Sequence, residues 1–311
     1  MPASEADVER AWADNKLAQV LYHDWEAETY DAKWSISFDE RCISYARDRF
    51  VAVAGTEGWP YGRALEIGAG TGFFALNLRQ AGVLSEVHVS DLSPGMVEAA
   101  KANAQRLGFE IEGRVGDAEH LPYDDGEFDL VVGHAVIHHI PDVELALREI
   151  LRVLRPGGRF VIAGEPTTVG DWYARRLGRV TWAATTRLTH LPPLRDRWAR
   201  PQEELDESSR AAALEAVVDL HTFDPDQLAR MALRAGAVDV RTQTEELTAA
   251  FLGWPVRTFE AAVNPQRLGW GWSMFAYRSW LRLSAVDRLL TRTHVVPPRL
   301  FYNVALTGLA P

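Results

Sequence analysis

A glycine-rich turn directly after an apolar segment is the sequence feature that most constrains the fold of this chain. Residues 64–72 read Ala-Leu-Glu-Ile-Gly-Ala-Gly-Thr-Gly, so that every second residue from position 68 is glycine. The apolar segment predicts a buried strand, and the residues after the turn predict a helix. Glycines at such positions allow positive φ angles or a close approach of the backbone to a ligand. The segment therefore predicts a strand–turn–helix unit of an α/β fold with a ligand at the turn.

The segments around this turn alternate between strand-like and helix-like patterns. Short apolar strands that alternate with helices predict a parallel sheet with helices on both faces. The predicted strands cover 63–67, 86–90, 110–115, 128–133, 158–163 and 237–244, with a closing strand over 299–309. The predicted helices cover 4–25, 39–54, 72–81, 94–107, 142–153, 225–235 and 274–290.

Two segments do not fit this alternation and divide the chain into parts. Residues 167–222 predict helices, and the tryptophan-rich residues 251–298 stand where a short hairpin loop would suffice between two strands. We expect one domain with a helical cap over residues 1–60, a ligand-binding core over 61–166, a helical lid insert, and C-terminal core strands over 223–311.

The composition argues against several classes of protein. The net charge of −10 over 311 residues argues against a nucleic-acid partner, because the phosphate backbone is bound chiefly through excess lysine and arginine. The one cysteine, Cys42, excludes an internal disulfide and fits a reducing compartment. The sequence shows neither the pattern of a signal peptide nor an apolar run of about 18 residues. We therefore expect a cytoplasmic protein without a membrane span.

Arginine is concentrated in two late segments of this acidic chain. Residues 171–200 contain seven arginines and two acidic residues, and residues 251–311 contain the same numbers. One interpretation is that solvated helix faces carry these charges. The other interpretation is a positive rim around a site that binds an anionic acceptor or an acidic surface.

Acidic residues stand before and after the turn at positions that suit a nucleotide-like ligand. Asp91 ends the second predicted strand, 25 residues after Glu66, and Asp117 ends the third. A dinucleotide fingerprint would require a small residue at position 73, where this chain has Phe73. Together with the Leu-Arg-Pro-Gly-Gly turn at 154–158, the pattern resembles the class I S-adenosyl-L-methionine (SAM)-dependent methyltransferases, especially those of ubiquinone and menaquinone biosynthesis.

The resemblance covers residues 60–165 and implies the fold, the cofactor and the residues that hold it. It implies a doubly wound, Rossmann-like sheet of seven strands in the order 3-2-1-4-5-7-6, with the last strand antiparallel, and SAM as the cofactor. The turn and the helix N-terminus can present backbone N–H groups to the methionine carboxylate. Residues expected to bind or cover the cofactor are Tyr30, Glu66, Gly68, Ala69, Gly70, Thr71, Gly72, Asp91, Leu92, Met96, Asp117, Ala118 and His134.

Several of these residues have distinct roles in the resembling family. An acid at Asp91 accepts hydrogen bonds from the ribose hydroxyls, and Leu92 and Met96 pack on the adenine. Asp117 receives the adenine amine, and the backbone N–H of Ala118 meets the adenine ring. These assignments are what the resemblance implies for this chain.

The roles of Glu66 and Tyr30 each have two interpretations. Glu66 either organises the N–H groups of the turn or meets the methionine ammonium group. Tyr30 and Asp31 are similar to a Tyr-Asp pair that covers SAM in the quinone-type enzymes. The alternative is that the helix around this pair only packs on the core.

Two histidines follow the fourth predicted strand. Residues 133–142 read Gly-His-Ala-Val-Ile-His-His-Ile-Pro-Asp and resemble a hydrophobic-His-His-hydrophobic-Pro-Asp segment common in the same superfamily. Either His138 or His139 could act as a general base, because the reference pKa of histidine is near 6.5, or could hold the loop by hydrogen bonds. We expect no metal site, since no set of carboxylates matches His134 and these two histidines.

Glu165 follows the fifth predicted strand, whose carboxyl end should face the site. Its carboxylate could take a proton, bind an acceptor ammonium group or stabilise a developing cation. Alternatively, it pairs with an arginine of the lid. His138 and Glu165 are therefore the candidate catalytic residues.

The two inserted segments are expected to determine the acceptor. Aromatic side chains that line a cavity would favour a hydrophobic acceptor, and arginines at its mouth would favour an anionic one; alternatively, the aromatic residues only pack the lid. Helix 274–290 could instead contact a membrane surface. We interpret the chain as a methyltransferase (EC 2.1.1 type) for a small, mainly hydrophobic acceptor that is methylated on O, C or N. A non-catalytic SAM-binding module and an NAD-dependent oxidoreductase are the alternatives.

Overall fold

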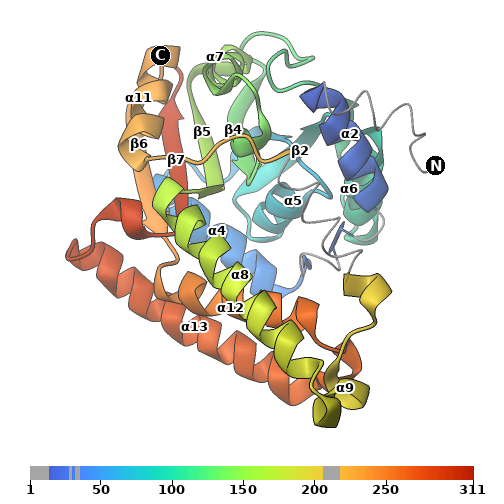
Figure 1. Cartoon of the computed structure of the whole chain (residues 1–311). Coiled ribbons are helices and arrows are strands. Elements are labelled where there is room, and N and C mark those ends of the chain that lie inside the picture. The colour runs from blue at the N-terminus through green and yellow to red at the C-terminus, as the bar shows by residue number, and fades with distance from the viewer. Residues whose placement is uncertain (1–13, 28–29, 32–35, 206–217) are drawn as a thin grey trace.

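Seven strands form one sheet, shown in Figure 1. The structure is a computed structural model that describes residues 14–27, 30–31, 36–205 and 218–311. The strands are β1 (Tyr61–Ile67), β2 (Leu84–Asp91), β3 (Glu112–Val115), β4 (Phe128–His134), β5 (Leu154–Pro166), β6 (Val238–Glu245) and β7 (Asn303–Leu309). Their order across the sheet is β3-β2-β1-β4-β5-β7-β6, which confirms the order implied by the resemblance. As implied, β7 runs antiparallel to both of its neighbours, while the other neighbouring pairs are parallel.

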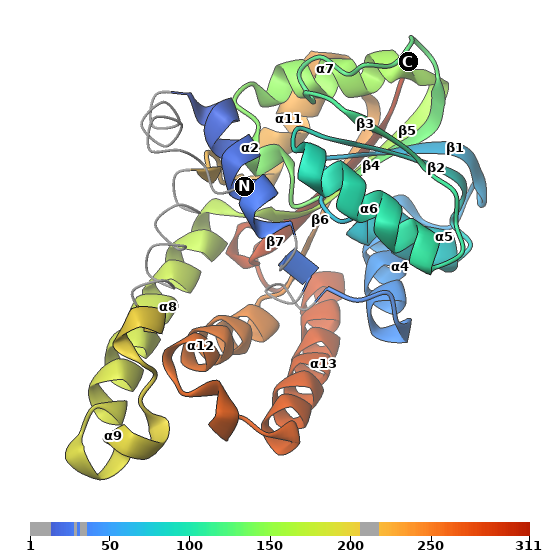
Figure 2. The same cartoon turned by 90° about the vertical axis from the view of Figure 1, so that its right-hand side faces the viewer.

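Helices cover both faces of this sheet, which confirms the doubly wound arrangement (Figure 2). The helices described are α2 (Asn15–Glu26), α4 (Glu40–Ala54), α5 (Phe73–Gln80), α6 (Pro94–Arg106), α7 (Val143–Val153), α8 (Thr168–Thr189), α9 (Pro192–Trp198), α11 (Pro225–Ala235), α12 (Thr248–Ala262) and α13 (Trp270–Thr293), with short 3₁₀ turns η1 (Ile137–His139), η2 (Pro265–Arg267) and η3 (Pro298–Leu300). Buried side chains of α7 and α11 pack on one face, and those of α4 and α5 pack on the other. Side chains of β1 alternate between the two cores: Leu65 and Ile67 face the first, and Ala64 faces the second.

Short polar side chains set the starts of the core helices. Asp142 accepts a hydrogen bond from the backbone N of Leu145 (2.9 Å) at the start of α7. Ser93 accepts one from the backbone N of Met96 (3.1 Å) at the start of α6, where proline occupies the first position. Both helices begin within one residue of their predicted starts because these caps are local to the sequence.

The fifth strand begins earlier than the sequence predicted. The Leu-Arg-Pro-Gly-Gly segment, predicted as a turn before a strand at 158, belongs to β5, which starts at Leu154 beside Phe128. The backbone N of Gly157 donates to Ala310 O (3.0 Å), and Ala310 N donates to Gly158 O (2.8 Å). The predicted start was wrong because pairing with distant residues at the C-terminus extends the strand through a proline-glycine sequence.

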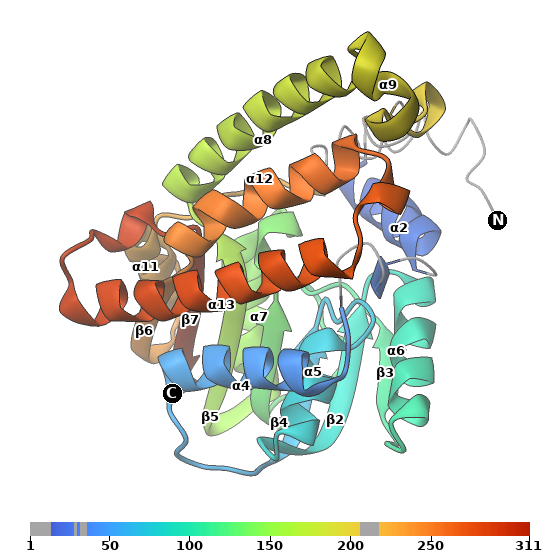
Figure 3. The ribbon, with the colours of Figure 1, turned by 90° about the horizontal axis from the view of Figure 1, so that it is seen from below.

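Three helices lie side by side across the carboxyl edge of the parallel strands, as Figure 3 shows from below. α12 lies between α8 and α13, and α4 lies next to α13. α8 follows β5 directly, and α12 and α13 lie between β6 and β7 in the chain. Of the helices in the described ranges, none is both long enough and apolar enough to cross a bilayer. The carboxyl edge of the parallel strands therefore faces a helical layer.

Candidate functional site

The glycine-rich turn has the backbone conformation that its sequence predicted. Gly68, Gly70 and Gly72 have φ angles of +52°, +50° and +82°. A Cβ atom on Gly68 would lie 2.1 Å from Cγ2 of Val136, so a side chain has no space there. Gly72 forms the left-handed N-cap of α5. The turn thus requires glycine for its shape, and it also contacts the loop after β4.

Glu66 connects this turn to the helix that follows it. Its carboxylate is buried and accepts hydrogen bonds from the backbone N of Phe74 (3.3 Å) and of Ala75 (2.9 Å) in the first turn of α5. Burial raises the pKa of Glu66 to about 8. Both carboxyl oxygens of Glu66 contact backbone N–H groups. These contacts match the first of its two predicted roles, the organisation of the turn.

Asp91 links the turn to the next helix. Its Oδ2 accepts a hydrogen bond from Gly70 N (2.8 Å), and its Oδ1 accepts one from Ser93 N (2.9 Å). Burial raises the pKa of Asp91. Leu92 is partly buried beside it, and Met96 is fully buried in α6. The structure therefore brings the predicted ribose acid against the turn; its contact with a ribose stays a prediction.

The Tyr-Asp pair lies over the turn. The Tyr30 ring is 3.8 Å from where a Cβ of Gly70 would be. Asp31 accepts hydrogen bonds from Thr71 Oγ1 (2.6 Å) and from Asn103 Nδ2 (3.3 Å). Asn103 also donates to the carbonyl oxygen of Thr71 (2.9 Å). These bonds hold Asp31 against the turn and against α6.

Asp117 lies two residues beyond the end of β3 and has a cationic partner. Lys16 Nζ lies 2.5 Å from Asp117 Oδ2 and also donates to Glu119. Three residues along α2, Gln19 Nε2 donates to the carbonyl oxygens of His139 (3.2 Å) and Val218 (2.9 Å). α2 is therefore held across the carboxyl ends of β3 and β4. The predicted contacts of Asp117 and Ala118 with adenine stay predictions.

His134 ends β4 among aromatic rings. Its Nε2 is 3.2 Å from the hydroxyl oxygen of Tyr45, and its ring contacts Phe73 and Phe74 at centroid distances of 5.2 and 5.4 Å. Burial lowers the pKa of His134 to about 4, so the ring is neutral near pH 7. The ring fills the space that a side chain at Gly164 would need. His134 thus forms the wall between α5 and β5, and its contact with a cofactor stays a prediction.

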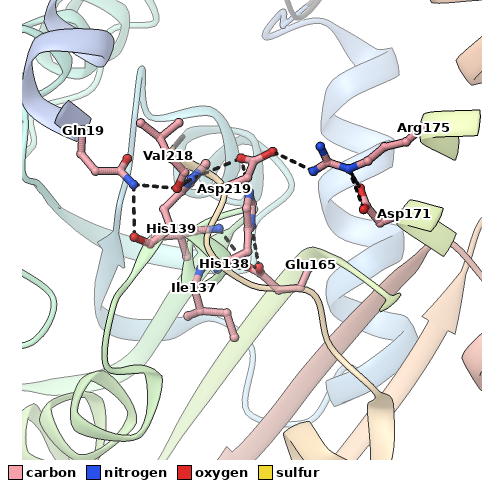
Figure 4. Close-up of polar contacts among 10 residues, drawn as sticks. Gln19, Ile137, His138, His139, Glu165, Asp171, Arg175, Val218 and Asp219 are labelled. Atoms are coloured by element: carbon pink, nitrogen blue, oxygen red, sulfur yellow. Dashed lines mark hydrogen bonds and ion pairs between the residues drawn. The ribbon is translucent and has the colours of Figure 1, made fainter. Parts of the chain in front are cut away.

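Glu165 is fully buried at the end of β5 and orders the loop after β4 (Figure 4). Its Oε1 accepts hydrogen bonds from the backbone N of Val136 (2.8 Å) and Ile137 (3.1 Å). Its Oε2 accepts one from His138 N (3.1 Å) and lies 2.8 Å from Nδ1 of the His138 ring. Within the described ranges no arginine pairs with Glu165. The carboxylate therefore holds both the backbone and the imidazole of the candidate base.

Asp219 faces both histidines from the segment after α9. Its Oδ1 lies 3.8 Å from His138 Nε2 and 3.5 Å from His139 Nδ1, and the two rings are 3.9 Å apart between centroids. His139 Nδ1 also lies 3.0 Å from the carbonyl oxygen of Val218. Burial raises the pKa of Asp219 and lowers that of His139 well below its usual value. The cluster therefore pairs a neutral His139 with a histidine–carboxylate unit.

An arginine of the helical layer closes this cluster. Arg175 on α8 lies 3.6 Å from Asp219 Oδ2 and forms an ion pair with Asp171 at 2.6 Å (Figure 4). The ligand atoms of His138, His139 and Asp219 lie within 4.8 Å of one another, as metal ligands do. Val218 O and Arg175 already occupy His139 Nδ1 and Asp219 Oδ2. The arrangement thus suits proton transfer better than metal binding.

Four side chains that complete this site were not predicted from the sequence. Asn103 shares the buried side of α6 with Met96, and a polar residue in an apolar helix pattern was the one available signal. Lys16, Tyr45 and Asp219 belong to no motif. Their positions follow from the packing of α2, α4 and the segment before α11, which local sequence does not encode.

Residues 65–162 match a protein family described as a methyltransferase domain. Among curated proteins, the demethylmenaquinone methyltransferase of Thermus thermophilus is 38% identical over 104 residues, 33% of this chain and 47% of the relative. The malonyl-[acyl-carrier protein] O-methyltransferase of Geobacter sulfurreducens is 37% identical over 150 residues, 48% of this chain and 53% of the relative. Residues 65–162 of this chain therefore form a domain of the class I SAM-dependent methyltransferase type. The cofactor of such a domain is S-adenosyl-L-methionine, as the resemblance implied.

The family model and the curated relatives match only part of this chain. The chain spans about half the length of these curated relatives, 47% and 53%. A solved phosphoethanolamine N-methyltransferase 2 from Haemonchus contortus, in complex with SAM, shares the fold with a TM-score of 0.50 and 16% identity, over 93% of this chain and 60% of that one. The family match ends at residue 162, before Glu165 and the helical layer. The family match therefore includes neither Glu165 nor the helices of this layer.

Proposed function

We propose that this methyltransferase transfers the methyl group of SAM to a small, mainly hydrophobic acceptor and releases S-adenosylhomocysteine. The observation that carries this proposal is a continuous contact between the cofactor turn and the candidate base. Gly68 packs against Val136, Val136 N donates to Glu165, and Glu165 holds the ring of His138. A donor turn and a proton acceptor joined in this way suit a reaction that aligns two substrates.

The residues at the turn fit the cofactor. Three glycines leave the backbone open, and Asp91 and Asp31 hold the turn from two sides. When bound, SAM supplies an electrophilic methyl group on sulfur. The chain itself contributes backbone N–H groups for the methionine carboxylate at the start of α5 and carboxylates for the polar groups of the nucleoside.

We propose that His138 removes a proton from the acceptor. Because Glu165 Oε2 is a hydrogen-bond acceptor, the proton of the neutral imidazole resides on Nδ1, and the basic lone pair lies on Nε2. The Glu165 carboxylate stabilises the imidazolium that forms when Nε2 takes the proton. Glu165 acts through His138, so we assign it as a positioning residue.

The hydrophobic character of the acceptor is also a proposal. The names of the two relatives give different acceptors, demethylmenaquinone and malonyl-acyl carrier protein, and do not select one. Tyr173 of α8 stacks on Phe251 of α12 with centroids 4.4 Å apart, and the same helix α8 carries the arginine that contacts Asp219. Aromatic side chains in the helical layer that also contacts Asp219 favour an acceptor with an apolar body and one ionisable group.

The test is product formation by the full chain. Purified protein is incubated with isotopically labelled SAM and a panel of quinols, phenols and hydrophobic acids, and S-adenosylhomocysteine is quantified. We expect label to transfer to at least one hydrophobic hydroxyl compound. Calorimetric titration with SAM and NADH accompanies this assay. Binding of NADH instead of SAM would favour an oxidoreductase, and SAM binding without transfer to any acceptor would favour a binding module.

A further inference from the structure

The outward side of α13 combines large apolar side chains with arginines. Phe275, Leu281, Val286 and Leu289 are 54%, 43%, 45% and 61% exposed. Four arginines of the same helix are also exposed, at positions 278, 282, 288 and 292. Positions three or four residues apart lie on one side of a helix. We call this side the α13 outer face, which consists of Phe275, Arg278, Leu281, Arg282, Val286, Arg288, Leu289 and Arg292.

The α13 outer face contains no carboxylate. The one acidic residue of α13, Asp287, is buried, and it accepts backbone hydrogen bonds from Leu247 (3.0 Å), Thr248 (2.8 Å) and Ala249 (2.9 Å) at the start of α12. Glu260 of α12 accepts a hydrogen bond from Trp272 (2.6 Å). The acidic residues of these two helices are therefore used inside the helical layer.

The four arginines of this face have no acidic partner within the part of the chain that the structure describes. Some arginines elsewhere on the surface form such pairs, for example Arg175 with Asp171 and Arg200 with Glu204. Guanidinium groups without carboxylates, placed between exposed apolar side chains, leave both a charge and an apolar surface uncompensated. The face therefore has the chemistry of a binding surface.

The opposite side of α13 is packed toward the site. The ring of Trp280 stacks on Tyr45 with centroids 6.4 Å apart, and the hydroxyl of Tyr45 contacts His134 at the end of β4. The guanidinium of Arg49 lies between these rings and the acidic end of β6, 3.0 Å from Glu245. These contacts hold α13 in place, so the orientation of its outer face is set by the fold.

We infer that the α13 outer face docks on an anionic lipid surface, with its arginines on the phosphate groups and its apolar side chains between the lipid headgroups. An amphipathic helix with arginines beside large apolar residues is suited to the interface of a bilayer. A twofold contact with a second copy is disfavoured, because it would bring the four guanidinium groups together without a carboxylate. The large exposed apolar side chains between the arginines disfavour nucleic acid, whose backbone is bound mainly through basic and polar groups. This inference does not depend on the methyl-transfer reaction.

The test is flotation of the full chain with lipid vesicles. We expect the protein to float with vesicles of phosphatidylcholine and phosphatidylglycerol, to bind vesicles of phosphatidylcholine alone weakly, and to be released by salt. The double variant Arg282→Gln/Arg288→Gln should weaken binding about tenfold or more. The matched control Arg148→Gln/Arg230→Gln, with the same charge change on exposed sites of α7 and α11, should bind as the unchanged protein does.

A second variant separates the apolar contribution. Leu281→Ser/Leu289→Ser should weaken binding to the anionic vesicles while the remaining binding keeps its salt dependence. Circular dichroism checks that each variant keeps its fold. Absence of flotation with anionic vesicles, or an equal loss in the arginine control, would overturn the inference. So would a dimer in sedimentation experiments that the leucine variant dissociates, because it would assign the face to a second copy.

Discussion

Two buried glutamates, Glu66 and Glu165, stand at the carboxyl ends of β1 and β5 and differ in what they hold. Glu66 accepts hydrogen bonds from two backbone N–H groups at the start of α5. Glu165 accepts three from residues 136–138 and also contacts the imidazole of His138 at 2.8 Å. A buried carboxylate thus orders the glycine-rich turn in the case of Glu66 and orients the His138 ring in the case of Glu165.

This difference leads to different expected consequences of mutation. A carboxylate that holds only backbone groups affects the stability and shape of the cofactor turn. A carboxylate that also holds a histidine ring affects the protonation chemistry of that ring. Variants of the two sides should therefore separate into effects on stability or cofactor affinity and effects on turnover.

The largest expected effect is on turnover when the proposed base is removed. His138→Ala should lower kcat by about 10²- to 10⁴-fold, because general-base assistance is lost, while the Kd for SAM stays the same. Steady-state kinetics and calorimetry measure the two quantities. The control His190→Ala removes an exposed histidine of the helical layer and should leave both unchanged. An unaltered kcat in His138→Ala would place the base elsewhere or limit catalysis to alignment.

Glu165→Gln should reduce kcat by at least about a hundredfold with a smaller effect on SAM affinity. Glutamine keeps the shape of the side chain and removes the negative charge beside His138. Loss of that charge disfavours the imidazolium, so the acidic limb of the pH–rate profile should move to lower pH. If kcat falls without such a movement, Glu165 has a structural role only.

Glu66→Gln should change how stability depends on pH. Burial raises the pKa of Glu66 to about 8, above its unfolded value, so its contribution to stability is present at low pH and lost as the pH rises through 8. Between pH 5 and pH 8.5 the unchanged protein should lose on the order of 4 kcal/mol relative to the glutamine variant, which does not titrate. Urea unfolding at several pH values measures this difference. If the free energy of unfolding depends on pH in the same way for both proteins, the raised pKa of Glu66 is contradicted.

The smallest expected effect is on cofactor affinity. Asp91→Ala should weaken SAM binding by about tenfold or more, on the order of 1.4 kcal/mol, because the predicted ribose contact and the bond to Gly70 are both lost. The control Asp226→Ala removes an exposed carboxylate of α11. Calorimetric titration measures the Kd for SAM of both variants. An unchanged Kd in Asp91→Ala would contradict the predicted contact of Asp91 with the ribose.

The cofactor side was largely predictable because its signals are local in the sequence. The turn at 68–72 follows its strand directly, and Asp91 ends the next strand, so short-range patterns carry both. The sheet order and the antiparallel β7 followed from the family resemblance and are confirmed. The contacts of these residues with SAM stay predictions.

The acceptor side was not predictable in the same way. Asp219 lies 81 residues after His138 in the sequence, yet its Oδ1 is 3.8 Å from Nε2 of His138. Lys16 reaches Asp117 across 101 residues. No periodicity relates such residues, because their proximity depends on how α2 and α8 pack over the sheet edge.

By itself, the sequence determined the strand–turn–helix unit, the alternation of the core and its cofactor family. Each of these follows from backbone requirements that neighbouring residues meet, such as positive φ at Gly68. The tertiary structure alone decided that Glu165 binds the loop of His138, that Asp219 joins this pair, and that the arginines of α13 face outward. Those outcomes depend on how elements that are distant in the sequence pack together. That packing decides which hydrogen-bond donors lie next to a buried carboxylate.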